Sequence, residues 1–184
     1  MNMTPTTRDA EGPYWVPDAP VRAGSIASLD LPGLPLLVEG RVMDACGQPL
    51  AGAILDVWQA DARGRYHGAG EDGHRLRGRV RTDARGRYRF ETIMPGRYSD
   101  DDGIRPAHLH VSFLAPDGRL LLTSQLYFEG DPYLGEADYA TRVGSCNSAD
   151  RTRHLRLVDG FVGSRFGKRT VFDAVVAREE RPQK

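Results

Sequence analysis

Two histidines one residue apart, His108 and His110, have the spacing of a metal-binding pair. Pro106 lacks a backbone N–H and biases the residue before it towards extended geometry, so a helix is unfavourable here. In a strand, residues i and i+2 point to the same face, about 6–7 Å apart. The pair would therefore present two imidazoles side by side, as one half of a metal site. Taken alone, such a pair is more often two half-exposed strand histidines than a metal site.

Tyr66 and Tyr98 are candidates for the other half of the site, and each stands two residues after a glycine expected to form a turn. A phenol has a pKa near 10 and must lose its proton before it binds a metal, which a hard trivalent cation such as Fe(III) can drive. Two imidazoles and two phenolates would bring a ferric ion near charge balance, and hard oxygen ligands suit iron. Tyr88 is the competing tyrosine, but it alternates with Phe90 and is interpreted as a core residue.

Many short strands joined by turns are expected to position these residues. The 184 residues include 21 glycines and 12 prolines, which suits such a fold. The stretch DARGRY occurs at residues 61–66 and again at 83–88, and we interpret it as two similar Asp-to-Gly turns, because nothing else recurs at that period. Strands are predicted over residues 36–42, 53–59, 79–82, 88–90, 108–114, 120–128, 152–158 and 170–177.

The remaining segments complete the expected architecture. Residues 68–77 and 99–104 are predicted to be loops, and residues 136–142 to contain one helical turn. Regularly spaced strands with little helix indicate an all-β fold, namely a single-domain β-sandwich. We expect residues 1–33 to form an N-terminal arm and residues 34–184 to form the sandwich domain.

The composition excludes several classes of protein. Lys and Arg (25) balance Asp and Glu (25), so the sequence offers no basic surface for a nucleic-acid partner. No stretch approaches the roughly 20 apolar residues that span a bilayer, and residues 1–10 lack the apolar run of a signal peptide. Cys46 and Cys146 lie far apart and are interpreted as free thiols, although a disulfide stays open. We therefore expect a soluble, cytoplasmic protein with no membrane partner.

Several ordered motifs carry a resemblance to a known family. They are GRV at residues 40–42, PLAGAILDVWQA at 49–60, GRY at 64–66, TD at 82–83, GRYRF at 86–90, TIMPGRY at 92–98, RPAHLH at 105–110 and LTSQLYFEGDP at 122–132. Over roughly residues 11–134 they resemble the intradiol ring-cleavage dioxygenases, and the last motif is most similar to the protocatechuate 3,4-dioxygenase-like members. An ordered combination of motifs is far more specific than any one of them.

The resemblance implies an enzyme with Fe(III) as cofactor and with a catechol and O2 as substrates. Such an enzyme cleaves the aromatic ring between its two hydroxyl-bearing carbons and gives a cis,cis-muconate-type diacid. The iron ligands that the resemblance implies are Tyr66, Tyr98, His108 and His110. Tyr98 is also implied to be catalytic, because substrate would displace its phenolate, which then takes a substrate proton.

The resemblance also implies roles for four residues around the substrate. Arg105 matches the arginine that faces the substrate ring, where a fixed cation would stabilise developing negative charge. The alternative for Arg105 is a surface guanidinium. Gln125 matches a pocket glutamine, and Pro13 and Tyr14 match arm residues that line the pocket. On sequence pattern alone, a cover that packs Tyr14 and Trp15 on a sheet edge is favoured over a pocket role.

Two departures from the family leave questions open. The connections over residues 66–82 and 98–105 are short, which leaves the identity of the catechol open and predicts an open pocket. The helical N-terminal region through which some relatives dimerise is lacking, so a homo-oligomer is neither required nor excluded.

Two alternative functions have their own sequence signals. Residues 40–98 also resemble transthyretin-like β-sandwich modules, which bind other molecules without catalysis and need neither a His-x-His pair nor a tyrosine pair. A histidine-based Fe(II) or zinc site would need a carboxylate ligand, and none stands at ligand spacing beside His108 and His110.

Overall fold

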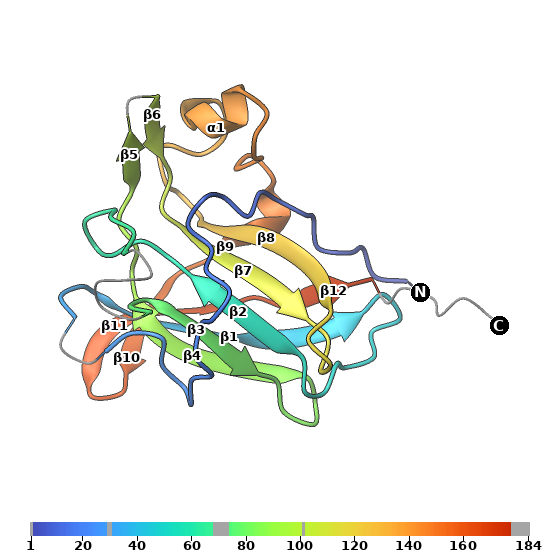
Figure 1. The fold of residues 1–184 in the computed structure, drawn as a ribbon. Coiled ribbons are helices and arrows are strands. Elements are labelled where there is room, and N and C mark those ends of the chain that lie inside the picture. The colour runs from blue at the N-terminus through green and yellow to red at the C-terminus, as the bar shows by residue number, and fades with distance from the viewer. Residues whose placement is uncertain (1, 29–30, 68–73, 101, 178–184) are drawn as a thin grey trace.

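The computed structural model describes residues 2–28, 31–67, 74–100 and 102–177, which contain two β-sheets packed face to face (Figure 1). The first sheet has the order β10-β11-β1-β12, with β4 also paired to β1. Its strands are β1 (Pro35–Asp44), β4 (Arg87–Ile93), β10 (Val158–Val162), β11 (Arg165–Val171) and β12 (Ala174–Val176). The second sheet has the order β3-β2-β7-β8-β9. Its strands are β2 (Ile54–Trp58), β3 (Arg77–Arg81), β7 (His108–Leu114), β8 (Leu120–Phe128) and β9 (His154–Leu155).

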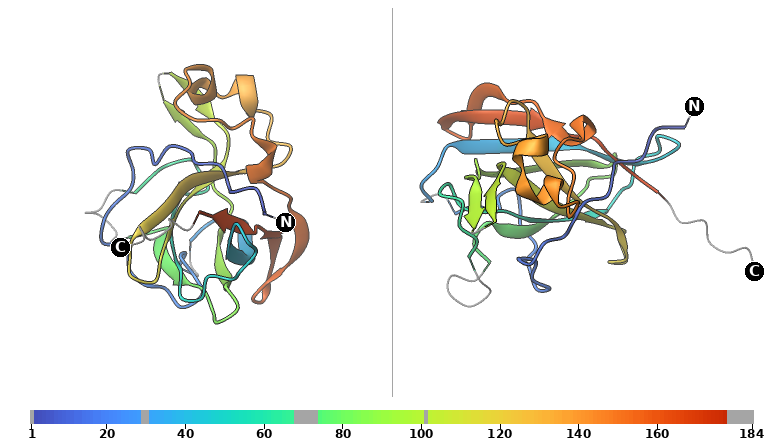
Figure 2. Two further views of the ribbon diagram at one scale, coloured as in Figure 1. Left: turned by 90° about the vertical axis from the view of Figure 1, so that its right-hand side faces the viewer. Right: turned by 90° about the horizontal axis from the view of Figure 1, so that it is seen from above.

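Smaller elements stand outside the two sheets (Figure 2). An antiparallel hairpin is formed by β5 (Tyr98–Asp100) and β6 (Gly103–Arg105). The 3-10 helices η1 (Gly135–Ala137) and η2 (Arg151–Arg153) flank α1 (Tyr139–Arg142) in sequence. Within the described residues, every helix is too short and too polar to cross a bilayer. The prediction of an all-β sandwich with little helix is confirmed.

Strand β7 is the central strand of the second sheet, and its two faces have different surroundings. Leu109 and Val111 are buried in the core between the sheets. Because alternate residues face opposite ways, His108 and His110 point to the outer face, and they are nevertheless only 4% and 3% exposed. The N-terminal arm, dark blue in Figure 1, lies across this face, and its Asp9 N–H donates to the β8 carbonyl of Thr123 at 3.0 Å. The arm therefore turns an outer sheet face into a protein interior.

The structure corrects two predictions between β8 and the C-terminus. Residues 152–158 do not form one strand, because Asp150 accepts the Thr152 N–H at 3.0 Å and caps η2, so that only β9 follows before β10 begins. The predicted strand over residues 170–177 is the end of β11 followed by β12, both parallel to β1. The first part of β11 escaped prediction because its buried position carries Gly167, which has no side chain, while the apolar Phe166 is exposed, so no apolar alternation results.

The two predicted loops also differ from the structure. Of the predicted loop over residues 99–104, residues 99–100 and 103–104 belong to β5 and β6, whose polar strands show no apolar alternation. The predicted loop over residues 68–77 lies partly outside the described residues, and β3 begins at its last residue, Arg77. Near the predicted helical turn, η1 and α1 form two short helices instead of one.

Tyr88 lies in the core, as its alternation with Phe90 predicts. It is 4% exposed, and its hydroxyl donates to the Phe172 carbonyl at 2.6 Å. Gly40 permits this approach, because a Cβ there would lie 1.8 Å from the same carbonyl oxygen. Tyr88 therefore joins β4 to the segment between β11 and β12. Its role is structural, and it is not part of the histidine cluster.

We expect Tyr88→Phe to lower the free energy of unfolding by about 1–2 kcal/mol, because it leaves the buried Phe172 carbonyl without its donor. Urea denaturation measures this change. Tyr133→Phe is the matched control, since its half-buried ring packs under Arg97 and it should shift stability by less than about 0.5 kcal/mol. A loss no larger than that of the control would contradict a structural role for the Tyr88 hydroxyl.

Candidate active site

Four side chains from three segments gather at the covered face of β7. The Nε2 atoms of His108 and His110 lie 3.1 Å apart, and the Tyr66 hydroxyl lies 3.0 Å from His108 Nε2. The Tyr98 ring stands edge-on to the Tyr66 ring, with centroids 6.0 Å apart. The structure thus brings together the two histidines and the two tyrosines that the sequence analysis singled out.

Two glycines place the tyrosine-bearing segments against each other. The Asp61 carboxylate accepts two backbone N–H groups of the turn before Tyr66, and Gly64 closes that turn at a φ of +79°. A Cβ on Gly64 would lie 1.9 Å from the carbonyl oxygen of the residue before Tyr98, and a Cβ on Gly96 would lie 2.4 Å from Gly64 N. The backbones of the two segments, around Gly64 and around Gly96, are therefore in direct contact, which only glycine at these positions allows.

The surroundings of the histidines fix how their rings are turned. His108 Nδ1 lies 2.7 Å from the Pro106 carbonyl, so Nδ1 carries the proton and Nε2 the lone pair. The His110 ring stacks on Trp58 at a centroid distance of 4.9 Å, and a Cβ on Gly12 of the arm would lie 3.2 Å from His110 Cε1. Burial lowers the pKa of His108 to about 4 and lowers that of His110 well below its ordinary value. Both imidazoles are neutral at pH 7, which is the form that binds metals.

The donor set fits a hard trivalent metal ion. Lone-pair atoms this close repel one another unless a proton or a cation stands among them. Within the described residues, no group of three or more His, Cys, Asp or Glu side chains could hold a metal, so a metal at this place needs the phenol oxygens. Burial raises the pKa of Tyr66, while the guanidinium groups of Arg105 and Arg77 lower it. Phenolate and imidazole ligands suit Fe(III), and the described residues lack the carboxylate that the Fe(II) or zinc alternative requires.

Arg105 is a buried cation next to this cluster and not a surface residue, since it is 8% exposed. Its Nε donates to Asp138 Oδ1 at 3.0 Å, and its Nη2 donates to Gln125 Oε1 at 2.9 Å. Asp138 is fully buried and also caps α1 by accepting the Ala140 N–H at 3.1 Å. Across the hairpin, Arg105 on β6 is the register partner of Tyr98 on β5. The guanidinium is thus held in one orientation from two sides.

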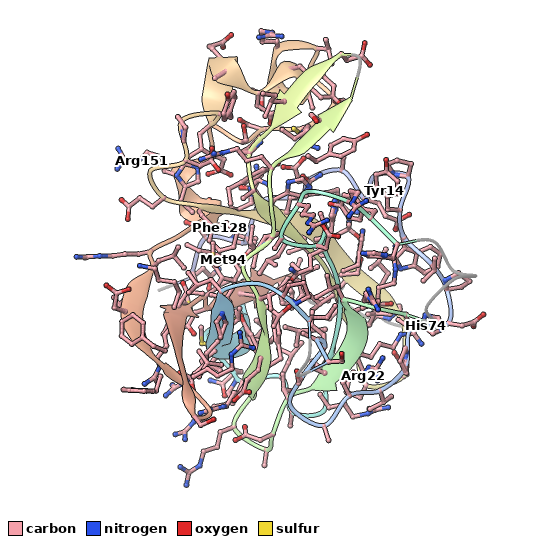
Figure 3. The ribbon with its side chains drawn as sticks, turned by 90° about the vertical axis from the view of Figure 1, so that its left-hand side faces the viewer. Tyr14, Arg22, His74, Met94, Phe128 and Arg151 are labelled. Atoms are coloured by element: carbon pink, nitrogen blue, oxygen red, sulfur yellow. The ribbon has the colours of Figure 1, made fainter. Side chains whose placement is uncertain are left out.

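The arm carries Tyr14 to the same place. The Tyr14 ring stacks on Tyr66 with centroids 4.1 Å apart and planes 7° apart, and its hydroxyl donates to the Tyr98 hydroxyl at 3.1 Å. Figure 3 labels Tyr14 on the arm, below the β5–β6 hairpin in that view. Pro13, its neighbour, is exposed. Of the two arm residues expected at the site, Tyr14 contacts the tyrosines of the cluster.

A buried network anchors the beginning of the arm. Asp9 forms an ion pair with Arg153, which is fully buried, and Asp9 also accepts the Tyr127 hydroxyl at 3.0 Å. Gln125 Nε2 donates to the Ala10 carbonyl at 2.8 Å. Gln125 thus contacts the arm with its amide nitrogen and Arg105 with its amide oxygen.

The two cysteines are free, as the sequence analysis predicts. Cys46 is exposed, and Cys146 is partly buried. Cys146 Sγ lies 3.2 Å from Arg105 Nη2, and burial raises the pKa of its thiol. The thiol is therefore a neutral neighbour of the guanidinium.

Several residues around the cluster escaped the sequence analysis. Asp138 is one of many acidic residues in loops, and Arg77 is one of many arginines, so neither carries a signal of its own. Trp58 has a signal that was not used, because it ends a predicted strand in which the polar residues Asp56 and Gln59 interrupt the apolar run. Gly12 directly precedes the Pro13-Tyr14 pair and could have been included with it.

Comparison with known proteins extends what the geometry shows. A family model described as dioxygenase matches residues 10–155, and curated catechol 1,2-dioxygenases are also similar to this chain. The chain belongs to the intradiol dioxygenase family. Catechol 1,2-dioxygenase 2 of Acinetobacter lwoffii is 39% identical over 159 residues, covering 76% of this chain and 57% of that protein. The protocatechuate 3,4-dioxygenase beta chain of Burkholderia cepacia is 43% identical over 109 residues, covering 54% of this chain and 46% of that one.

A solved dioxygenase domain matches the chain almost end to end. It is the dioxygenase domain of a dioxygenase–carbohydrate-binding protein fusion from Streptomyces sp. SirexAA-E, with a TM-score of 0.73 and 35% identity over 95% of this chain and 99% of that one. The chain spans only about half the length of the curated relatives it matches. The comparisons support the dioxygenase interpretation and not the transthyretin-like alternative.

We expect Asp138→Asn to lower the free energy of unfolding by about 3 kcal/mol, because it leaves the Arg105 charge buried without its counter-ion. Thermal and urea denaturation would measure the loss. Asp159→Asn is the matched control, since Asp159 pairs with Lys168 at the surface, where its side chain is 62% exposed, and should change stability by less than about 0.5 kcal/mol. Equal losses of unfolding free energy in the two variants would show that the buried Asp138–Arg105 pair stabilises the fold no more than a surface ion pair does.

Proposed function

We propose that this protein is an Fe(III)-dependent intradiol dioxygenase. It cleaves a catechol-type ring between the two hydroxyl-bearing carbons, inserts both atoms of O2 and releases a cis,cis-muconate-type diacid. The observation that carries the proposal is the approach of two neutral imidazoles and a phenol to within 3.1 Å, with a second phenol beside them. Membership of the family supports the same conclusion.

Four residues would hold the iron, namely Tyr66, Tyr98, His108 and His110. When bound, the ferric ion would supply a Lewis acid and a template for the two catechol oxygens. Two phenolates and two neutral imidazoles would leave a ferric ion with one positive charge, and a catechol dianion would bring the site to neutrality once one phenolate is released. This balance favours giving a proton to that phenolate as substrate binds.

Tyr98 is the tyrosine that we assign to proton transfer. Its Oη accepts a proton from a substrate hydroxyl, and Tyr14 Oη, 3.1 Å away, keeps a hydrogen bond to it. Tyr66 is less free to move, because its ring is stacked under Tyr14 and its hydroxyl lies against His108. One tyrosine therefore stays in place while the other exchanges its proton.

Arg105 stabilises the negative charge that develops on the substrate ring. A guanidinium held by Asp138 and Gln125 needs no reorientation during the reaction, and its burial removes competing water. Gln125 and Tyr14 line the substrate pocket, together with Pro13 at its exposed rim. Residues 1–33 thus act as the arm of the pocket, and residues 34–184 as the sandwich domain that carries the iron. We place the protein in the cytoplasm, because free thiols are typical of a reducing compartment.

Substitution of the proposed ligands tests the metal centre. The iron-loaded protein should be red-brown from phenolate-to-Fe(III) charge transfer, and Tyr66→Phe or His110→Ala should remove colour and bound iron together. Visible absorption and iron analysis provide the readouts, with Tyr88→Phe as the control that keeps both. A full visible band in either ligand variant would remove that residue from the ligand set.

Arg105→Ala separates charge stabilisation from metal binding. We expect this variant to keep its colour while turnover falls by on the order of 10²-fold or more, as for loss of a transition-state donor. Oxygen uptake across a panel of catechol, protocatechuate, hydroxyquinol and chlorocatechols measures turnover and identifies the preferred ring. Wild-type turnover in this variant would exclude Arg105 from the catalytic residues.

A further inference from the structure

We propose that Arg77 is a positioning residue that holds Tyr14 over Tyr66 and so sets the affinity of the pocket for its catechol. The inference rests on the proposed function, because it assigns a role within that site. Arg77 begins β3 and is 3% exposed, so its side chain lies inside the protein.

The hydrogen bonds of Arg77 reach both halves of the tyrosine stack. Its Nη1 donates to the backbone carbonyl of Tyr14 on the arm. Its Nη2 donates at 3.0 Å to the backbone carbonyl of His67, the residue after Tyr66. Because a guanidinium is planar and its N–H groups have fixed directions, one side chain fixes the two segments relative to each other. The parallel stack of Tyr14 on Tyr66, 4.1 Å between centroids, follows from this connection.

Near Tyr14 the other contacts of the arm come from side chains, since Tyr14 Oη donates to Tyr98 and the Trp15 side chain hydrogen-bonds to Asp56. The bond from Arg77 ties the backbone of the arm at Tyr14 to the first residue of β3. Stronger anchors lie on either side, at Ala10, which accepts from Gln125, and at Pro17, which accepts from Arg79 at 2.5 Å. The segment between these anchors is shaped by Arg77.

The charge of Arg77 makes its position costly for stability alone. Both of its acceptors are neutral carbonyls, and within the described residues no carboxylate hydrogen-bonds to it. Burial lowers the pKa of Arg77, opposed by the nearby Tyr66 and Asp56. Arg79, two residues along the same strand, is instead paired directly with Asp56 at 3.1 Å. A buried guanidinium without a bonded counter-ion adds little to folding, which favours a role in the site.

The consequence for catalysis is a change in substrate binding rather than in the chemical step. Without Arg77, Tyr14 would lose its fixed place as a wall of the pocket, whereas the proposed ligands and Arg105 would keep their own supports. We expect Arg77→Met to raise the KM for the preferred catechol by on the order of 10-fold and to change kcat by less than about 3-fold. The visible band should stay, because the iron ligands are unchanged.

The test combines this kinetic split with a measurement that does not depend on iron. Chymotrypsin cleaves after Tyr14 and Trp15, so limited digestion reports release of the arm. We expect cleavage there to become about 10-fold faster in Arg77→Met, with the melting temperature within about 3 °C of wild type. Arg89→Met is the matched control, because Arg89 on β4 is 55% exposed and its loss should alter neither cleavage nor KM.

A double-mutant cycle with Tyr14→Ala asks whether Arg77 acts through Tyr14. If it does, Arg77→Met should raise KM less than about 2-fold in the Tyr14→Ala background. Additive effects would overturn the inference, as would wild-type cleavage and KM in Arg77→Met. Arg77→Lys covers the case in which Arg77→Met fails to fold: lysine keeps the charge without the planar fork, so full recovery of KM and cleavage by lysine would also overturn it.

Failure of the proposed function would look different. A wild-type protein that oxidises none of the catechols would refute the dioxygenase assignment, whereas the digestion experiment would still decide whether Arg77 holds the arm.

Discussion

The site depends on one constraint: the outer face of β7 must be closed to water so that two neutral imidazoles can face each other at 3.1 Å. A sandwich does not provide this closure, because the outer face of a sheet is normally solvated. Here the closure comes from a segment without regular secondary structure. The buried Asp9–Arg153 ion pair and the amide of Gln125 hold that segment against β8, and Gly12 allows its backbone to lie directly on the His110 ring.

The two tyrosines and Arg105 reach the same face of β7 from other segments of the chain. The hydroxyls of Tyr66 and Tyr98 reach this face because Gly64 and Gly96 let the two tyrosine-bearing segments pack backbone against backbone. Arg105 reaches it from the β5–β6 hairpin and is held there by Asp138, which belongs to the helical segment after β8. Segments distant in sequence therefore each supply one polar group, and the rigid sandwich keeps them in place.

The sequence predicted the elements with a strong local signal and missed those defined by long-range contacts. Residues 108–114 and 120–128 alternate clearly and form β7 and β8 within the predicted bounds. The hairpin over residues 98–105 has no apolar periodicity, because its strands pair outside both sheets and have no core to face. The partners of Arg105 and Arg77 were invisible for a related reason, since a buried arginine is recognised by the groups that surround it and these lie 10 to 63 residues away. The four candidate ligands were found because their residue types are unusual and their spacing is local.

The pairing of Tyr98 with Arg105 at the base of the hairpin has an evolutionary consequence. In an antiparallel hairpin, residues added in pairs at the tip lengthen the ladder and leave the register at its base unchanged. Natural variation in the length of this hairpin can therefore change its outer end while Tyr98 and Arg105 stay opposite each other. Insertions at the tip would then alter the surface of the protein without moving the two residues paired at the base.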